Sequence, residues 1–502
     1  MRKAQIFIKN FLILTSTSLL INILGLLFNT YITNLVGTEC LGLFQLIMSV
    51  YMFAITLASS GIGLAATRIV SEELARNNQY HARKAAKKCV IYSFIVGILS
   101  CLLIILLSRT IATVWLHGKI NYIAICILGA SLPFVALSSS INGYFNAIRK
   151  ASKGALSQII EQMSKIIISV MLISNFMPQG LTYACMSLVI GVCSSEVFSF
   201  LYIFICYLKE MRHEKLDDTF TDNSNISKRI LNISVPIAIA SYIRSGLSTL
   251  KHILIPIRLE KSGVSCDIAL SEYGMINGVA MPLILFPSVF INSFSNLLIP
   301  EFSRYYATND NDKIKRIISR IFKTSSIFSI CMTFIFFIFS NDICILMYNN
   351  EKIATYVKIL SPLLFIIYLD TIVDSILKGL NEQLSVMKCN ILDLFVSISF
   401  IYFLLPVFGA YGYIVVIYIS EILNGLISIR KLLQLTNVKF NYILWLLKPF
   451  FAGLLTYQSL RLLNIFVYSS LFTLIIRMIL FILIYLFYLY LMSCISKKDI
   501  KI

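Results

Sequence analysis

Two cations lie seven residues apart in an otherwise largely apolar stretch, residues 230–256. At that spacing Arg244 and Lys251 share one face of a helix, with Ser248 on or beside it. A diphosphate would fit this face, because arginine grips phosphate oxygens in pairs and lysine acts as a point charge. The alternative is that both cations pair with carboxylates of neighbouring helices and only support packing. We predict that Arg244, Lys251 and Ser248 bind an anionic substrate.

A second charged pair lies in the apolar stretch 154–175. Glu161 and Lys165 are spaced i, i+4 with the acid first, which favours an ion pair along one helix, and Gln158 shares that face. Self-pairing and ligand binding both remain open for these residues. We include Glu161 and Lys165 among the predicted substrate-binding residues.

Two carboxylates lie one helical turn apart in residues 354–376. Asp370 and Asp374 would repel each other at that spacing unless one is protonated or a cation lies between them. They are therefore candidates for coupling transport to Na⁺ or H⁺. The alternative is a simple ion pair of Asp374 with Lys378.

The chain lacks the residue patterns of common catalytic and metal sites. It contains no phosphate-binding glycine loop, and its four histidines are scattered without metal-ligand spacing. Its twelve cysteines form no CxxC pair and are expected to be small buried hydrophobes. We predict a transporter rather than an enzyme, without catalytic residues, bound metal or cofactor.

The elements that position these residues must be membrane helices. The chain is 58% hydrophobic and only 13% charged, whereas soluble proteins carry about 25% charged residues. Crossing a membrane takes about 20 largely apolar residues, and lipid leaves no partner for unpaired backbone groups. We predict an all-α integral membrane fold with about fourteen spans. They are 11–33, 41–66, 88–108, 121–146, 154–175, 181–207, 230–256, 274–299, 321–340, 354–376, 386–405, 411–429, 442–463 and 469–494.

The basic residues are unevenly distributed between the two sides of these spans. Most of the 43 Lys and Arg fall on the side of the N-terminus. The other side receives only a few: Arg109, Lys119, Arg258, Lys261, Lys352, Lys358 and Arg461. Because basic loops stay in the cytoplasm, we expect both termini there, in a bacterial inner membrane. The net charge of +19 is thus attributed to membrane lipids and not to nucleic acid.

An internal repeat divides the spans into halves. Three pairs of short segments recur in the same order at a nearly constant offset: 39–45 with 272–277, 143–146 with 379–382, and 195–196 with 420–421. Six spans per repeat is an even number, so the halves are parallel. We expect an N-lobe at 1–208, a cytoplasmic linker at 209–229, a C-lobe at 230–440 and an appendage of two spans at 441–502.

Several segments resemble a known group of transporters. Residues 39–45, 59–73, 142–146 with 158–162, and 298–302 are similar to the multidrug/oligosaccharidyl-lipid/polysaccharide exporter superfamily, in the branch of stage V sporulation protein B and polysaccharide flippases. The resemblance implies a MATE-like fold and a flippase for a polyprenyl-diphosphate sugar carrier. Related lipid II flippases carry several arginines on the first two spans. Here the span 11–33 has no cation, which departs from that pattern.

Three functions follow from these observations. The first is export of a lipid-linked oligosaccharide or lipid II-like peptidoglycan precursor by alternating access, for the cell wall or the spore cortex. The second is a multidrug or cation antiporter of the MATE type, which Asp370 and Asp374 would favour. The third is a membrane scaffold of a cell-wall complex, which predicts that Arg244 and Lys251 are dispensable.

Overall fold

The computed structural model is almost entirely helical in the residues that it describes, which are 2–76, 78–115, 118, 121–212, 226–308, 310–438, 441–462 and 470–494. Residues 2–14 and Asn296 are described by their backbone alone. The α-helices are α1 (Arg2–Ser59), α2 (Ile62–Ala75), α3 (Gln79–Thr110), α4 (Tyr122–Ala147), α5 (Ala151–Phe176), α6 (Leu181–Arg212), α7 (Ile226–Glu260), α8 (Cys266–Tyr273), α9 (Met281–Leu285), α10 (Ser288–Ala307), α11 (Asn311–Tyr348), α12 (Glu351–Leu360), α13 (Leu364–Gly379), α14 (Gln383–Thr436), α15 (Lys448–Leu462) and α16 (Leu471–Leu491).

Within the described residues, twelve helical segments are long and apolar enough to cross a membrane. Two of them, Thr15–Ala75 and Gln383–Thr436, are far too long for one crossing of a core about 30 Å thick. Each contains a glycine with non-helical backbone: Gly37 at φ 87° and Gly409 at φ 58°. Since only glycine adopts such angles readily, these are the points where the chain turns back. Two crossings in each segment agree with the predicted total of about fourteen spans.

The outer surfaces of the helices carry large apolar side chains. Leu106 on α3 is 81% exposed, and exposed leucine, isoleucine and phenylalanine recur along α3, α14 and α16. In water such apolar surfaces would favour aggregation, whereas in a membrane they contact the hydrocarbon chains of the lipids. This pattern confirms the prediction of a multi-pass membrane protein.

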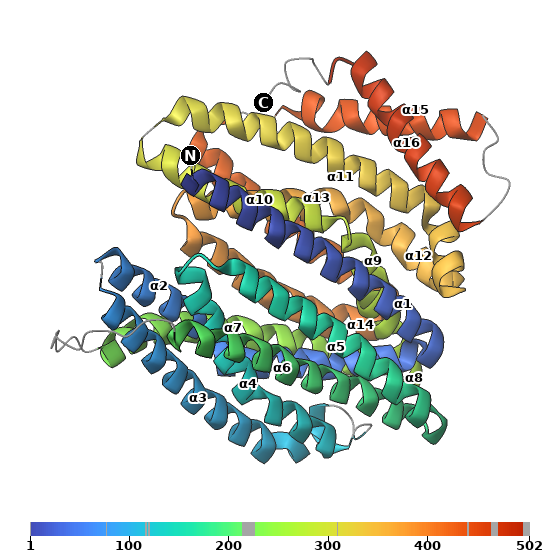
Figure 1. The fold of residues 1–502 in the computed structure, drawn as a ribbon. Coiled ribbons are helices and arrows are strands. Elements are labelled where there is room, and N and C mark those ends of the chain that lie inside the picture. Colours follow the sequence, from blue (N-terminus) through green and yellow to red (C-terminus); the bar gives the residue numbers. More distant parts are fainter. Residues whose placement is uncertain are drawn as a thin grey trace. The chain divides into compact units, whose positions relative to one another are not determined.

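The chain divides into two compact units. Unit 1 comprises Met1–Phe28, Val36–Ile257 and Cys266–Gly274. In it α3 packs along α4, α5 along α6, and α4 also contacts α2 and α6 (Figure 1). Its core joins five helices through small, branched aliphatic and aromatic side chains, among them Ala66 of α2, Ala85 of α3, Phe145 of α4, Ile203 of α6 and Ile230 of α7.

Unit 2 comprises Asn29–Leu35, Arg258–Ser265 and Met275–Ile502. Here α13 packs against α10, α11 and α14, and the pair α15 and α16 packs against α11 (Figure 1). An ion pair at 3.6 Å joins Arg477 of α16 to Asp342 of α11, so this intramembrane arginine is paired.

The six-span lobes predicted at 1–208 and 230–440 stay a prediction. Of the predicted linker 209–229, residues 213–225 lie outside the described part of the chain, as do 463–469 and 495–502 of the appendage.

Candidate functional site

Helix α7, which carries Arg244, lies antiparallel to the second half of α1 within unit 1. Three hydrogen bonds fix this register. Tyr242 donates to the carbonyl of Leu57 at 3.0 Å, and Thr249 donates to the carbonyl of Ser49 at 3.0 Å. Between them, the hydroxyl of Thr56 lies 3.1 Å from that of Ser245. The polar side chains of α7 therefore face α1 rather than lipid along this stretch.

A cavity of about 410 Å³ opens between these two helices. Among the described residues that line the cavity, Arg244 is the only cation, and most of the others carry hydroxyl groups. Its lining residues are Ile55, Thr56, Ser59, Ser60, Ser241, Arg244, Ser245 and Ser248. Helix α1 ends at Ser59, beside this cavity, and Gly61 takes a left-handed φ of 77° before α2 begins. A broken helix beside a polar cavity is a typical ligand site in membrane transporters.

Arg244 is exposed and makes no ion pair or hydrogen bond with any residue of the described chain. Ser248 lines the same cavity one turn along α7. The structure thus brings together two of the three residues predicted on this helix. An unpaired guanidinium among hydroxyl groups can bind an oxyanion, because the arginine supplies charge and the hydroxyls supply further donors.

Lys251, the third predicted residue, does not line this cavity. It is half-buried and has interactions of its own. Its neighbour His252 lies 3.0 Å from the hydroxyl of Tyr273, between Nδ1 and Oη. The shared helix face predicted from the spacing therefore does not extend as one binding surface from Arg244 to Lys251.

Glu161 and Lys165 belong to a separate polar cluster inside unit 1. Both are half-buried on α5, and no nitrogen–oxygen distance between them falls within 4.0 Å. At longer range, the charge of Lys165 still interacts with the carboxylates of Glu161 and of Glu196 on α6. A direct Glu161–Lys165 contact, as the spacing suggested, is not formed.

Asp370 and Asp374 lie in unit 2, where α13 faces α14. Asp370 is 9% exposed, and its Oδ2 accepts a hydrogen bond from Asn424 at 2.9 Å. Its Oδ1 has no partner among the described residues. Asp374 accepts from Ser428 at 3.5 Å. The predicted Asp374–Lys378 ion pair is absent, since Lys378 makes no ion pair with the described residues.

Further carboxylates surround Asp370. Those of Asp374, Glu421 and Asp393 are close enough for their charges to act on it. Several acids around one buried carboxyl group are stable only with a proton or cation among them. Sequence reasoning missed Asn424 and Ser428, although polar residues at 420, 424 and 428 form a regular stripe on an apolar helix.

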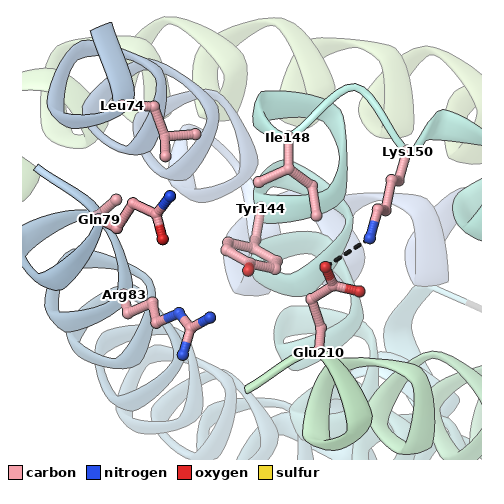
Figure 2. Close-up of a pocket in the computed structure, with 8 residues that line it drawn as sticks. Leu74, Gln79, Arg83, Tyr144, Ile148, Lys150 and Glu210 are labelled. Carbon is pink, nitrogen blue, oxygen red and sulfur yellow. Dashed lines mark hydrogen bonds and ion pairs between the residues drawn. The ribbon is translucent and has the colours of Figure 1, made fainter. Parts of the chain in front are cut away.

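Another cavity, of about 220 Å³, lies in unit 1 where α2, α4 and α6 end and α3 begins. Figure 2 shows Arg83 on one side, Tyr144 between, and Lys150 paired with Glu210 on the other. The Lys150–Glu210 distance is 2.5 Å, and Arg83 reaches the carbonyl of Met211 at 3.5 Å. One of the two cations in this cavity is thus neutralised by a lining carboxylate, whereas no carboxylate is among the described residues that line the cavity of Arg244.

Near the same end of unit 1, Arg229 at the start of α7 grips two adjacent carboxylates of α2. Its Nη2 lies 2.6 Å from Glu72 and its Nη1 2.6 Å from Glu73. This contact ties the first turn of α7 to the last turns of α2. It joins segments that are far apart in the chain, and no local spacing predicts it.

Comparison with known proteins places these features in a family. The chain matches the model for "Polysaccharide biosynthesis protein" over residues 7–306 and the model "MatE" over residues 267–403. It is 24% identical to stage V sporulation protein B of Bacillus subtilis (strain 168) over 407 residues, covering 80% of this chain and 78% of that protein. It is 21% identical to the lipid II flippase MurJ of the same organism, covering 84% and 81%.

Solved structures share the fold. A structure of the lipid II flippase MurJ in an inward closed conformation matches with a TM-score of 0.73 at 15% identity, covering 96% of this chain and 98% of that one. An inward-facing MATE family transporter of the MOP superfamily matches with a TM-score of 0.68 at 14% identity, covering 85% and 98%. These likenesses confirm the predicted MATE-like architecture.

Proposed function

Because the chain belongs to the polysaccharide biosynthesis protein family, within the multidrug/oligosaccharidyl-lipid/polysaccharide exporter superfamily, we propose that it is a flippase. Its substrate is a polyprenyl-diphosphate-linked sugar or peptidoglycan precursor, moved by alternating access. The relatives named as a lipid II flippase and as a sporulation protein support this substrate class.

The observation that carries the proposal is Arg244 in its hydroxyl-lined cavity. A cation in a membrane helix costs about 2.5–3.5 kcal/mol on insertion scales, so an arginine without a protein partner requires another reason to be there. A diphosphate supplies that reason, since it accepts paired hydrogen bonds from the guanidinium. A cationic drug would be repelled by the same group.

Transport by purified protein in vesicles tests this role directly. A fluorescent polyprenyl-diphosphate sugar would be placed in the inner leaflet, and its appearance outside followed with an impermeant quencher. We expect Arg244→Glu to lower the flipping rate by about tenfold to a hundredfold, because a charge-assisted hydrogen bond contributes about 1.5–3 kcal/mol. Arg244→Lys should retain part of the rate.

A matched control lies on the same helix. Lys228 is exposed near the start of α7, far along the chain from the cavity residues. Lys228→Glu makes the same change in charge and should flip the substrate at the wild-type rate. Wild-type flipping by folded Arg244→Glu would remove Arg244 from the site, whereas absence of flipping by the wild type itself would favour the scaffold alternative.

The antiporter remains the second candidate, on the strength of the carboxylates around Asp370. In the flippase these groups serve as the Na⁺ or H⁺ coupling site. In an antiporter they would bind the cationic substrate itself. Vesicles with an imposed ion gradient separate the two functions: export of an organic cation such as ethidium, without flipping of the lipid-linked sugar, would favour the antiporter.

The remaining features of the proposal concern orientation and chemistry. Both termini lie on the cytoplasmic side of a bacterial inner membrane, as the distribution of basic residues supports. The protein moves its substrate without making or breaking covalent bonds. Labelling of single cysteines introduced at Lys228 and Lys352, in a variant without native cysteines, tests the orientation: only the second should react with an impermeant reagent outside the cell.

A further inference from the structure

A third cavity, of about 370 Å³, lies within unit 2 between α11, α12 and α15. One wall is apolar and comes mainly from α11, with Phe334, Phe337 and Ile338 at i, i+3 and i+4 on one helix face. Helix α15 closes the other side with Leu454, Tyr457 and Arg461, spaced i, i+3 and i+7, and α12 contributes Lys358. The cavity therefore has an apolar wall and a cationic rim.

The two cations of this rim have no acidic partner in the part of the chain that the structure describes. Neither Lys358 nor Arg461 makes an ion pair with a residue of the described chain. The Lys358 ammonium lies 5.3 Å from the centre of the Phe337 ring, close enough for a cation–π contact. That contact places the charge above the apolar wall. Two positive charges beside a hydrophobic surface suit an anion that carries a hydrocarbon chain.

Two cations in one cavity are unusual on this side of the membrane. Lys358 and Arg461 are among the few basic residues predicted on the extracytoplasmic side, where Lys and Arg are scarce. Cations needed only to anchor helices at the interface would be spread around the rim of the protein. Here two helices that are distant in sequence bring both into one cavity.

We propose that this cavity binds the phosphate of a single lipid in the outer leaflet. Arg461 and Lys358 hold the phosphate oxygens, and the hydrocarbon chain lies along Phe334, Phe337 and Ile338. This site gives α15, which belongs to the appended pair of helices, a part in lipid recognition. It does not depend on the flippase proposal, because a structural phospholipid and a transported polyprenyl phosphate share this chemistry.

Lipid binding to the full-length purified protein tests the inference. Native mass spectrometry would titrate the protein in detergent with phosphatidylglycerol and with diacylglycerol, which lacks the phosphate. The wild type should bind phosphatidylglycerol at least tenfold more tightly, because only that lipid offers charged phosphate oxygens to the two cations. The Lys358→Gln/Arg461→Gln variant should lose this preference.

The control variant is Lys352→Gln, an exposed lysine of α12 outside the cavity lining. It should bind phosphatidylglycerol as the wild type does. An unchanged preference for phosphatidylglycerol in the double variant would overturn the site. Inorganic phosphate that competes as well as the lipid would overturn the role of the apolar wall.

Polyprenyl monophosphate, added in competition, identifies the source of the lipid. Displacement of phosphatidylglycerol at lower concentration by the polyprenyl lipid assigns the site to the transported carrier. The reverse order assigns it to a membrane phospholipid. A polyprenyl lipid and a phosphatidylglycerol that both bind the double variant as tightly as the wild type would overturn both assignments.

Discussion

Thr67 of α2 donates its hydroxyl hydrogen bond to the carbonyl of Gly143 of α4 at 3.0 Å. In unit 2, Ser303 of α10 donates in the same way to the carbonyl of Gly379 of α13, also at 3.0 Å. The two partners are 76 residues apart in both cases. Each unit thus contains the same helix contact, built at corresponding positions of the internal repeat.

The glycines in these contacts leave no room for a side chain. A Cβ on Gly143 would collide with the carbonyl oxygen of Gly63, and one on Gly379 would lie 2.9 Å from the carbonyl oxygen of Ile299. Gly63 and Ile299 are themselves corresponding positions. Small residues at helix crossings let backbones approach closely, which is how membrane helices associate in the absence of a hydrophobic driving force.

We therefore expect Gly143→Ala and Gly379→Ala to destabilise the protein by similar amounts, about 1–3 kcal/mol each, because a methyl group must force two backbones apart. Thermal unfolding in detergent measures the effect. Gly25→Ala is the control: its new Cβ would meet only the Gln162 amide at 3.7 Å, an ordinary contact. A melting temperature unchanged in both crossing variants would contradict the close approach.

The sequence indicated the repeat and the spans for a physical reason. Lipid demands apolar helices and makes each intramembrane charge costly, so spans and charges such as Arg244 and Asp370 stand out in the printed chain. Gly143 and Gly379 also stood out, because a position that admits only glycine retains it in both halves.

The hydroxyl groups around Arg244 could not be found in that way. The hydroxyls of Thr56 and Ser59 donate to carbonyls one turn back in their own helix, at 2.8 and 2.7 Å. Because these hydroxyls are already satisfied, burying them costs little free energy whether the side chain faces lipid or another helix. Nor can hydropathy tell which face of a membrane helix meets its neighbour, since lipid-facing and protein-facing sides are both apolar. For that reason the separation of Lys251 from the Arg244 cavity was not foreseen.

The Arg229 contact yields a prediction about stability. Glu73 is buried, with a side chain only 6% exposed, whereas that of Glu72 is 38% exposed. Arg229→Gln removes the main partner of a buried carboxylate, so we expect a loss of about 1–3 kcal/mol. Adding Glu73→Gln should recover more stability than adding Glu72→Gln, because Glu72 can be solvated. Thermal unfolding of these variants gives the order, and equal recovery by both would contradict it.

A third prediction concerns pH and the start of α11. Asp310 caps this helix by accepting from the backbone N–H of Lys313 at 3.2 Å, and it pairs with the Lys313 ammonium at 2.7 Å. These bonds to Lys313 lower the pKa of the Asp310 carboxyl. Because the pKa of Asp310 is lower in the folded state, the ionised carboxylate stabilises the start of α11 at pH values above the ordinary pKa of aspartate. This stabilisation is lost as the pH falls through the folded-state pKa.

Hydrogen exchange at the Lys313 amide follows this cap. The opening equilibrium of that amide, corrected for intrinsic exchange, should shift toward the open state as pH falls below about 4. Asp310→Asn should abolish the pH dependence yet keep the cap, since Asn78 caps α3 in the same way by accepting from His81. Asp310→Ala should open the helix start at every pH. Equal exchange in all three proteins would show that the cap contributes nothing.

The last prediction concerns energy coupling at Asp370. Asn has the same shape as Asp, so Asp370→Asn should keep the contact with Asn424 while removing the charge that a proton or Na⁺ would neutralise. Flipping in vesicles with an imposed Na⁺ or H⁺ gradient should then proceed only at the rate seen without a gradient. Asp312→Asn, which removes an exposed carboxylate at the start of α11, should leave the stimulation by the gradient intact. If the folded Asp370→Asn protein still responds fully to the gradient, the carboxylates around Asp370 serve packing, and the coupling ion binds elsewhere.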